Sequence, residues 1–82
     1  MPEQINNLRL KYAVEMRLRF IDFLMHHYGT LNRSAIMDFF GVSMPQAALD
    51  IRTYVEIAPG NMIYDKSAKT YRRSEHFTRV WA

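Results

Sequence analysis

The chain has 82 residues, of which 49% are hydrophobic and 23% charged, and its formal net charge at pH 7 is +3. This length is enough for one small domain, which argues against a catalytic cleft between two lobes, and the absence of cysteine excludes a disulfide framework, a Cys-ligated zinc site and a thiol nucleophile. The apolar runs are too short for a membrane span and the first residues do not form a signal peptide, so we expect a cytoplasmic protein with no membrane partner.

The first predicted element is a helix over residues 4–28. Polar residues recur along it at steps of three or four and predict one solvated face: Lys11, Glu15, Arg19, Asp22 and His26. The rest of the circumference is largely apolar and wider than the stripe of ~100° that one core needs. Either a second protomer covers the excess, or the rest of the small domain wraps around the helix. Arg17 lies inside the apolar arc, and we expect its charged end to reach outward to solvent.

A second helix is predicted over residues 33–40. Asn32 can cap it, because its side-chain oxygen can accept a free backbone N–H of the first turn. Gly41 can end it in a left-handed conformation. The apolar residues that this helix should bury are Ile36, Phe39 and Phe40.

A third helix is predicted over residues 44–58. Ser43 and Gln46 have the spacing of a capping box, and Pro45 is compatible with the first turn. The core-facing residues recur at steps of four and three: Ala47, Ile51, Tyr54 and Ala58. The opposite face carries Gln46, Leu49, Arg52 and Thr53.

A β-hairpin is predicted over residues 62–73, with a polar turn at 65–68. An isolated two-stranded ribbon is only marginally stable, so Ile63 or Tyr64, together with Tyr71, should pack on the helices. Residues 1–60 contain six basic and six acidic side chains, so the whole net charge lies in residues 61–82. Four of the five cations in that segment belong to the hairpin: Lys66, Lys69, Arg72 and Arg73.

Two helices joined by a three-residue turn and followed by a basic hairpin predict a mainly α fold with a small β-hairpin, the winged helix-turn-helix. The pattern favours binding to double-stranded DNA, because an α-helix fits the major groove and a helix N-terminus attracts phosphate. On this hypothesis Gln46, Leu49, Arg52 and Thr53 face the groove. Gln46 contacts adenine, Leu49 a thymine methyl group, and Arg52 guanine or phosphate. The hairpin cations would contact the phosphate backbone.

Each of these assignments has a structural alternative. Gln46 can simply complete the capping box, Leu49 can cover a core residue, and Arg52 can pair with Glu56 on the same helix. The hairpin cations can be an ordinary solvated surface. The corresponding alternative function is a winged helix that binds another protein and not DNA.

No chemistry of catalysis or metal binding is indicated. The adjacent His26 and His27 diverge by about 100° on a helix, which does not suit a shared metal ion. The serines have no local signature of a hydrolase triad, and the glycines stand alone and not in a phosphate-binding loop. We therefore expect no catalytic residue, no metal and no cofactor.

The segments FFGVSMPQA (39–47) and APGNMIYDKSAKTY (58–71), with RFIDF (19–23) and LNRS (31–34), carry a family resemblance. Over about residues 17–78 the chain resembles the N-terminal winged helix of WYL-domain transcription regulators, nearest to the CapW/BrxR group of repressors encoded with bacterial anti-phage defence systems. The wing block 58–71 is the most specific part.

The resemblance implies a homodimer that binds an inverted repeat in a promoter. It also implies DNA contacts for Ser43, Pro45, Gln46 and Arg52, and a wing that includes Lys66, Lys69 and Tyr71. Members of that group continue into a WYL domain and a dimerisation domain. We therefore expect residues 1–78 to be the DNA-binding domain and residues 79–82 to begin a linker, and we do not carry over ligand sensing.

Overall fold

The structure is a computed structural model that describes residues 3–81, with side chains from Lys11 onward. The elements are α1 (Glu3–His27), β1 (Thr30–Leu31), α2 (Arg33–Phe40), α3 (Met44–Ile57), β2 (Met62–Asp65) and β3 (Thr70–Arg73). The predicted fold class is confirmed, and each predicted helix agrees with an observed one to within one residue at either end. The predicted limits of the domain (1–78) and of the linker (79–82) include residues 1, 2 and 82, which lie outside the described residues.

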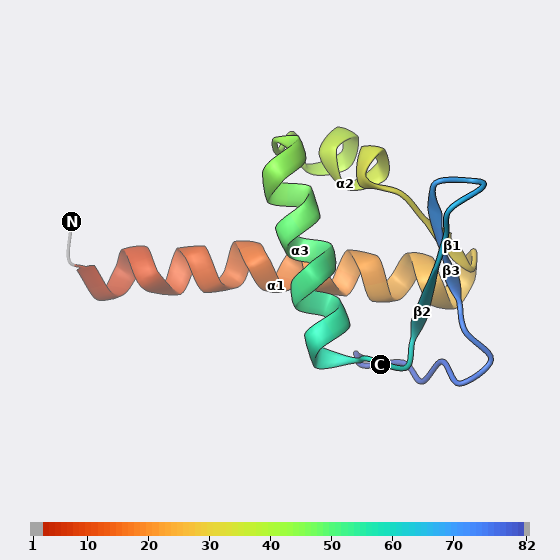
Figure 1. Cartoon of the computed structure of the whole chain (residues 1–82). Coiled ribbons are helices and arrows are strands. Elements are labelled where there is room, and N and C mark those ends of the chain that lie inside the picture. Colours follow the sequence, from red (N-terminus) through yellow and green to blue (C-terminus); the bar gives the residue numbers. More distant parts are fainter. Residues whose placement is uncertain (1–2, 82) are drawn as a thin grey trace.

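The two-stranded hairpin is confirmed and extended by a third strand. The antiparallel sheet has the order β1-β3-β2, with Leu31 and Tyr64 both paired with Tyr71. Figure 1 shows this small sheet beside the C-terminal end of α1, with α3 crossing the middle of that helix. The two-residue strand β1 has no periodicity of its own, so the sequence could not reveal it.

The core lies where α1, α2 and α3 meet. Its buried apolar residues are Leu18, Ile21, Met25, Leu31, Ile36, Ala47, Ile51 and Tyr54. Three of the four residues predicted to line the core side of α3 are among them, and the fourth, Ala58, is half-buried. The packing of α3 was therefore predictable from its period.

The expected burial of Phe39 is wrong, since 68% of this residue is exposed. Ile36 and Phe40 are four residues apart and share one side of the two-turn α2, while Phe39 is rotated by about 100° from Phe40. Its ring instead stacks on Phe20 of α1 with centroids 4.5 Å apart.

Two expectations for polar residues of α1 are also wrong. Asp22 was assigned to the solvated face but is 1% exposed, because the segment after β3 returns over α1 and its Val80 and Trp81 N–H groups donate to this carboxylate. Arg17 does not extend to solvent. It is 9% exposed, and its Nε lies 2.6 Å from Oδ2 of the buried Asp50 in α3.

The hairpin packs on the helices through residues other than those expected. Ile63 and Tyr64 are 60% and 47% exposed. Half-buried Met62 and Tyr71 make the contact with the core, so the expectation holds for Tyr71 alone. None of the described helices has a stretch long and apolar enough to cross a bilayer.

Candidate nucleic-acid interface

The turn between α2 and α3 is built as the sequence predicts. Gly41 ends α2 with φ 68°, and Ser43 caps α3, its Oγ accepting the Gln46 backbone N–H at 3.3 Å. Pro45 lies in the first turn of α3. At the start of α2, Asn32 Oδ1 accepts the Ala35 N–H at 3.0 Å. Local capping therefore sets the directions of both helices.

The outer face of α3 presents several predicted contact residues to solvent. Leu49 is 48% exposed, so it does not cover the core. Arg52 is also exposed, and within residues 11–81 no ion pair joins it to Glu56. Thr53 is half-buried and its hydroxyl donates to the Leu49 carbonyl at 2.9 Å. The guanidinium of Arg52 is thus available to a ligand.

Gln46 forms only half of the expected capping box. Its backbone N–H binds Ser43, but its side chain turns toward Asp50, with Nε2 donating to Oδ1 at 2.9 Å. The carboxylate of Asp50 therefore receives hydrogen bonds from Gln46 and from Arg17. The sequence did not predict that Asp50 and Arg17 belong to this site, because their pairing depends on how α1 crosses α3.

The wing has an ordered turn. Asp65 Oδ1 accepts the backbone N–H groups of Ser67 and Ala68 at 2.9 and 3.1 Å. Lys69 has a left-handed backbone, with φ 52°. The side chains of Lys66 and Lys69 are exposed, which leaves both ammonium groups accessible from outside.

The two arginines of β3 have different surroundings. Arg72 forms a surface ion pair with Asp65 at 3.5 Å. Arg73 turns toward α1, where its Nη1 donates to the carbonyls of Met25 and His26 at 3.2 and 2.7 Å. The guanidinium of Arg73 thus occupies the C-terminal end of α1, where a cation is favoured by the helix dipole.

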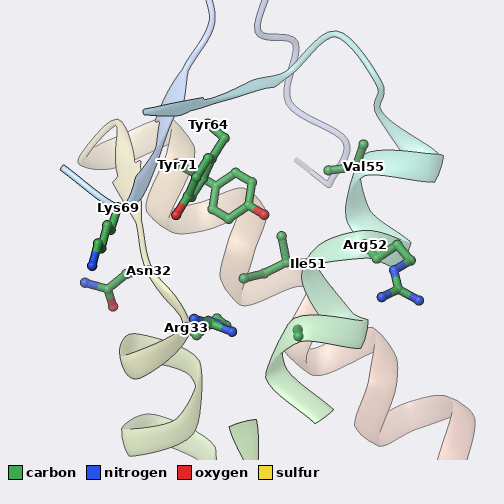
Figure 2. A pocket seen from close by; sticks show the side chains of 9 residues that line it. Asn32, Arg33, Ile51, Arg52, Val55, Tyr64, Lys69 and Tyr71 are labelled. Atoms are coloured by element: carbon green, nitrogen blue, oxygen red, sulfur yellow. The ribbon is translucent and has the colours of Figure 1, made fainter. Parts of the chain in front are cut away.

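A hollow of about 450 Å³ lies between α2, α3 and the wing. Its lining comprises Asn32, Arg33, Ala48, Ile51, Arg52, Val55, Tyr64, Lys69 and Tyr71. Figure 2 shows Lys69 and Asn32 on one side, Arg52 and Val55 on the other, and the two tyrosines between them. This hollow brings together Arg52, Lys69 and Tyr71 from the predicted site.

The charged side chains that line this hollow are all positive. Arg33 of α2, Arg52 of α3 and Lys69 of the turn between β2 and β3 contribute cations, and the lining includes no carboxylate. Arg33 was not among the predicted site residues, although its position directly after the cap Asn32 was a usable signal. The other predicted contacts do not line the hollow: Ser43, Pro45, Gln46, Leu49, Thr53, Lys66, Arg72 and Arg73.

Such a surface can hold an extended anion. Three cations around one concavity, with two phenol rings beside them, suit a sugar-phosphate strand better than a compact ion. Across the described residues no group of three or more His, Asp or Glu side chains could hold a metal ion.

Comparison with known proteins identifies a family. The family model described as "BrxR transcriptional regulator winged helix-turn-helix domain" matches residues 13–82. The chain is 44% identical over 71 residues to the DNA-binding transcriptional repressor CapW of Escherichia coli (strain KTE188), which covers 87% of this chain and 24% of that protein. A repressor of the same name from Pseudomonas aeruginosa is 45% identical over 71 residues, with the same coverage.

A more distant relative from Stenotrophomonas maltophilia, also named DNA-binding transcriptional repressor CapW, is 33% identical over 78 residues, which are 95% of this chain and 26% of that protein. The chain therefore spans about a quarter of the length of the curated relatives it matches.

Proposed function

The chain belongs to the BrxR family of transcriptional regulators, whose winged helix-turn-helix domain it contains, and from this premise we propose that it binds double-stranded DNA in a sequence-specific manner. The N-terminal half of α3 enters the major groove, where Pro45, Gln46 and Leu49 approach base edges. The wing, with Lys66, Lys69 and Tyr71, follows the sugar-phosphate backbone. The domain binds and does not catalyse.

The observation that carries this proposal is the cationic hollow beside α3. Arg33 at the start of α2, Arg52 on α3 and Lys69 on the wing surround one concavity without a carboxylate in its lining. A DNA strand that crosses this concavity brings phosphates to all three cations while α3 lies in the adjacent groove. Arg73 is omitted from the proposed contacts, because its guanidinium already binds the end of α1.

The names of the relatives support a wider proposal for the whole protein. They are DNA-binding transcriptional repressors. We infer that the protein containing this domain is a cytoplasmic repressor, and that two copies bind the two halves of an inverted repeat in a promoter.

The test is a salt titration of the 82-residue chain with a duplex taken from upstream of its own gene. If each protomer neutralises about three to five phosphates, the logarithm of the affinity falls with the logarithm of salt at a slope of roughly −3 to −5. Lys11→Gln serves as the matched control, because it removes an exposed cation of α1 outside the hollow. No binding at low salt would overturn the proposal.

A second function, protein–protein contact, is favoured by an aromatic surface formed by α1, α2 and the segment after β3. A hollow of about 480 Å³ is lined mostly by apolar side chains, among them Phe20, Phe23, Phe39 and Trp81. Phe23 and Phe39 are 42% and 68% exposed. We propose that a second copy of the chain covers this aromatic surface.

Sedimentation of the chain over a concentration series tests this second function. A monomer–dimer equilibrium that Phe39→Ser abolishes would support it, with the exposed Tyr64→Ser of the wing as control. A strict monomer at high concentration would exclude it.

A further inference from the structure

The buried ion pair between Arg17 and Asp50 orients the side chain of Gln46. Asp50 is 1% exposed and lies between Arg17, which donates from α1 at 2.6 Å, and Gln46, which donates from the first turn of α3 at 2.9 Å. Gln46 itself is half-buried. These hydrogen bonds thus connect the core of the domain with the edge of the surface proposed to enter the major groove.

This arrangement decides which end of the amide faces outward. An ionised carboxylate only accepts hydrogen bonds, so it can bind the NH₂ end of an amide and not its oxygen. Because Arg17 pairs with Asp50, Gln46 must turn Nε2 toward the carboxylate, and Oε1 points the other way. Flipping the amide would set two acceptors against each other beside a buried charge.

The oxygen of Gln46 is free to bind a ligand. In the described part of the chain Oε1 accepts no hydrogen bond, and no buried side-chain polar atom there lacks a partner. Oε1 is therefore reached by solvent. In the major groove the hydrogen-bond donors on base edges are the exocyclic amino groups of adenine (N6) and cytosine (N4). Guanine and thymine present acceptors there.

We propose that Asp50, held by Arg17, is a positioning residue that fixes Gln46 with its carbonyl oxygen outward, so that the base it contacts is adenine or cytosine and not guanine or thymine. This inference rests on the proposed DNA binding and makes it more specific. The second N–H of Nε2 can add a contact to N7 when the base is adenine, whereas guanine, which has the same N7, would set its O6 acceptor against Oε1.

The experiment first locates the base position and then varies the positioning residue. Selection from random duplexes with the wild-type chain gives the preferred site, and the position whose preference disappears in Gln46→Ala is the one that Gln46 contacts. Affinities are then measured for all four base pairs at that position. Wild type should prefer the natural adenine or cytosine of that base pair by at least about fivefold over an analogue without the exocyclic amino group, purine or pyrimidin-2-one, and Gln46→Ala should not.

Asp50→Asn should reduce this preference to less than about twofold, because Arg17 offers only donors and takes the asparagine oxygen, so the asparagine NH₂ faces Gln46 and turns Oε1 inward. Binding to the best site should change much less than the preference. Asp38→Asn is the matched control: it removes the same charge from an exposed position of α2 and should leave the preference unchanged.

Asp50→Asn leaves Arg17 buried without its full partner and can unfold the domain. The double variant Arg17→Met with Asp50→Leu removes both charges together, and should also lose the preference while its circular dichroism spectrum stays helical. A merely structural hydrogen bond would alter stability without altering base preference.

The outcomes separate the two proposals. A wild-type chain that binds no duplex at low salt overturns the proposed function and this inference with it. A wild-type chain that binds specifically but loses no affinity when the exocyclic amino group is removed at the Gln46 position overturns the inferred orientation alone. Retention of the wild-type preference in both Asp50 variants overturns the positioning role.

Discussion

The hydroxyl of Tyr54 in α3 donates a 2.5 Å hydrogen bond to the carboxylate of Asp22 in α1, and both side chains are almost fully buried. The same carboxylate accepts the backbone N–H groups of Val80 and Trp81 at 3.0 Å. One acidic residue therefore ties the first helix to the proposed recognition helix and to the segment that follows the wing.

Removal of this carboxylate should destabilise the domain strongly. Asp22→Ala leaves the Tyr54 hydroxyl and two backbone donors without an acceptor, which should lower the free energy of unfolding by about 2–4 kcal/mol. Urea denaturation followed by circular dichroism measures the change. Glu75→Ala, which removes a carboxylate whose side chain is 88% exposed, should stay within about 0.5 kcal/mol of wild type. A loss below about 1 kcal/mol for Asp22→Ala would contradict this account.

Stability should fall at alkaline pH because of Tyr54. Burial of the hydroxyl raises the pKa of Tyr54 above its ordinary value, and its hydrogen bond to Asp22 acts in the same direction. Above about pH 10 the unfolded chain loses this proton and the folded chain keeps it, so the stability falls by up to about 1.4 kcal/mol per pH unit. Below that pH the contribution is fully present. Tyr54→Phe should be less stable at pH 7 and should show a shallower decline between pH 9.5 and 11.

The adjacent arginines of β3 should have separate roles. Arg73→Gln removes a cation bound to the C-terminal carbonyls of α1 and should cost about 1–2 kcal/mol of stability. Arg72→Gln removes only a surface ion pair and should change stability by less than about 0.5 kcal/mol. For DNA affinity the opposite order is expected: Arg72→Gln should weaken binding more than Arg73→Gln when each affinity is calculated per folded protein. Equal stabilities of the two variants would argue against the capping role of Arg73.

Lys69 combines a left-handed backbone with a proposed phosphate contact. Lys69→Gly should raise stability by roughly 1 kcal/mol, because only glycine adopts φ 52° without steric cost. Lys69→Ala keeps that cost and should leave stability nearly unchanged. Both variants remove the ammonium group and should weaken binding to specific and random DNA alike. Thermal melts and fluorescence anisotropy together separate the two effects.

Arg33 provides a test of the hollow itself. Arg33→Gln should reduce the magnitude of the salt slope by about one, with little change in base preference, since a phosphate contact is independent of sequence. Anisotropy titrations at four or five salt concentrations give the slope. An unchanged slope would remove Arg33 from the interface.

Much of the site was visible in the sequence because it is local. Each of the signals involves residues only a few positions apart in the chain. They are the caps Asn32 and Ser43, the apolar period of α3, and the cluster of cations in residues 61–82. They suffice to predict three helices, a tight turn and a basic wing. They also place Leu49 and Arg52 correctly on the outer face of α3.

Local sequence patterns therefore define the elements and the sign of the charge on the wing. The tertiary structure alone fixed the partners of the polar groups that join distant elements, since these pairs lie far apart in the chain: Arg17 with Asp50 across 33 residues, Tyr54 with Asp22 across 32, and Arg73 with His26 across 47. A polar residue on a helix has the same local pattern whether it meets water or a folded-back segment. Its environment is fixed only when α1, α3 and the C-terminal segment pack together, because burial makes pairing of a charge obligatory.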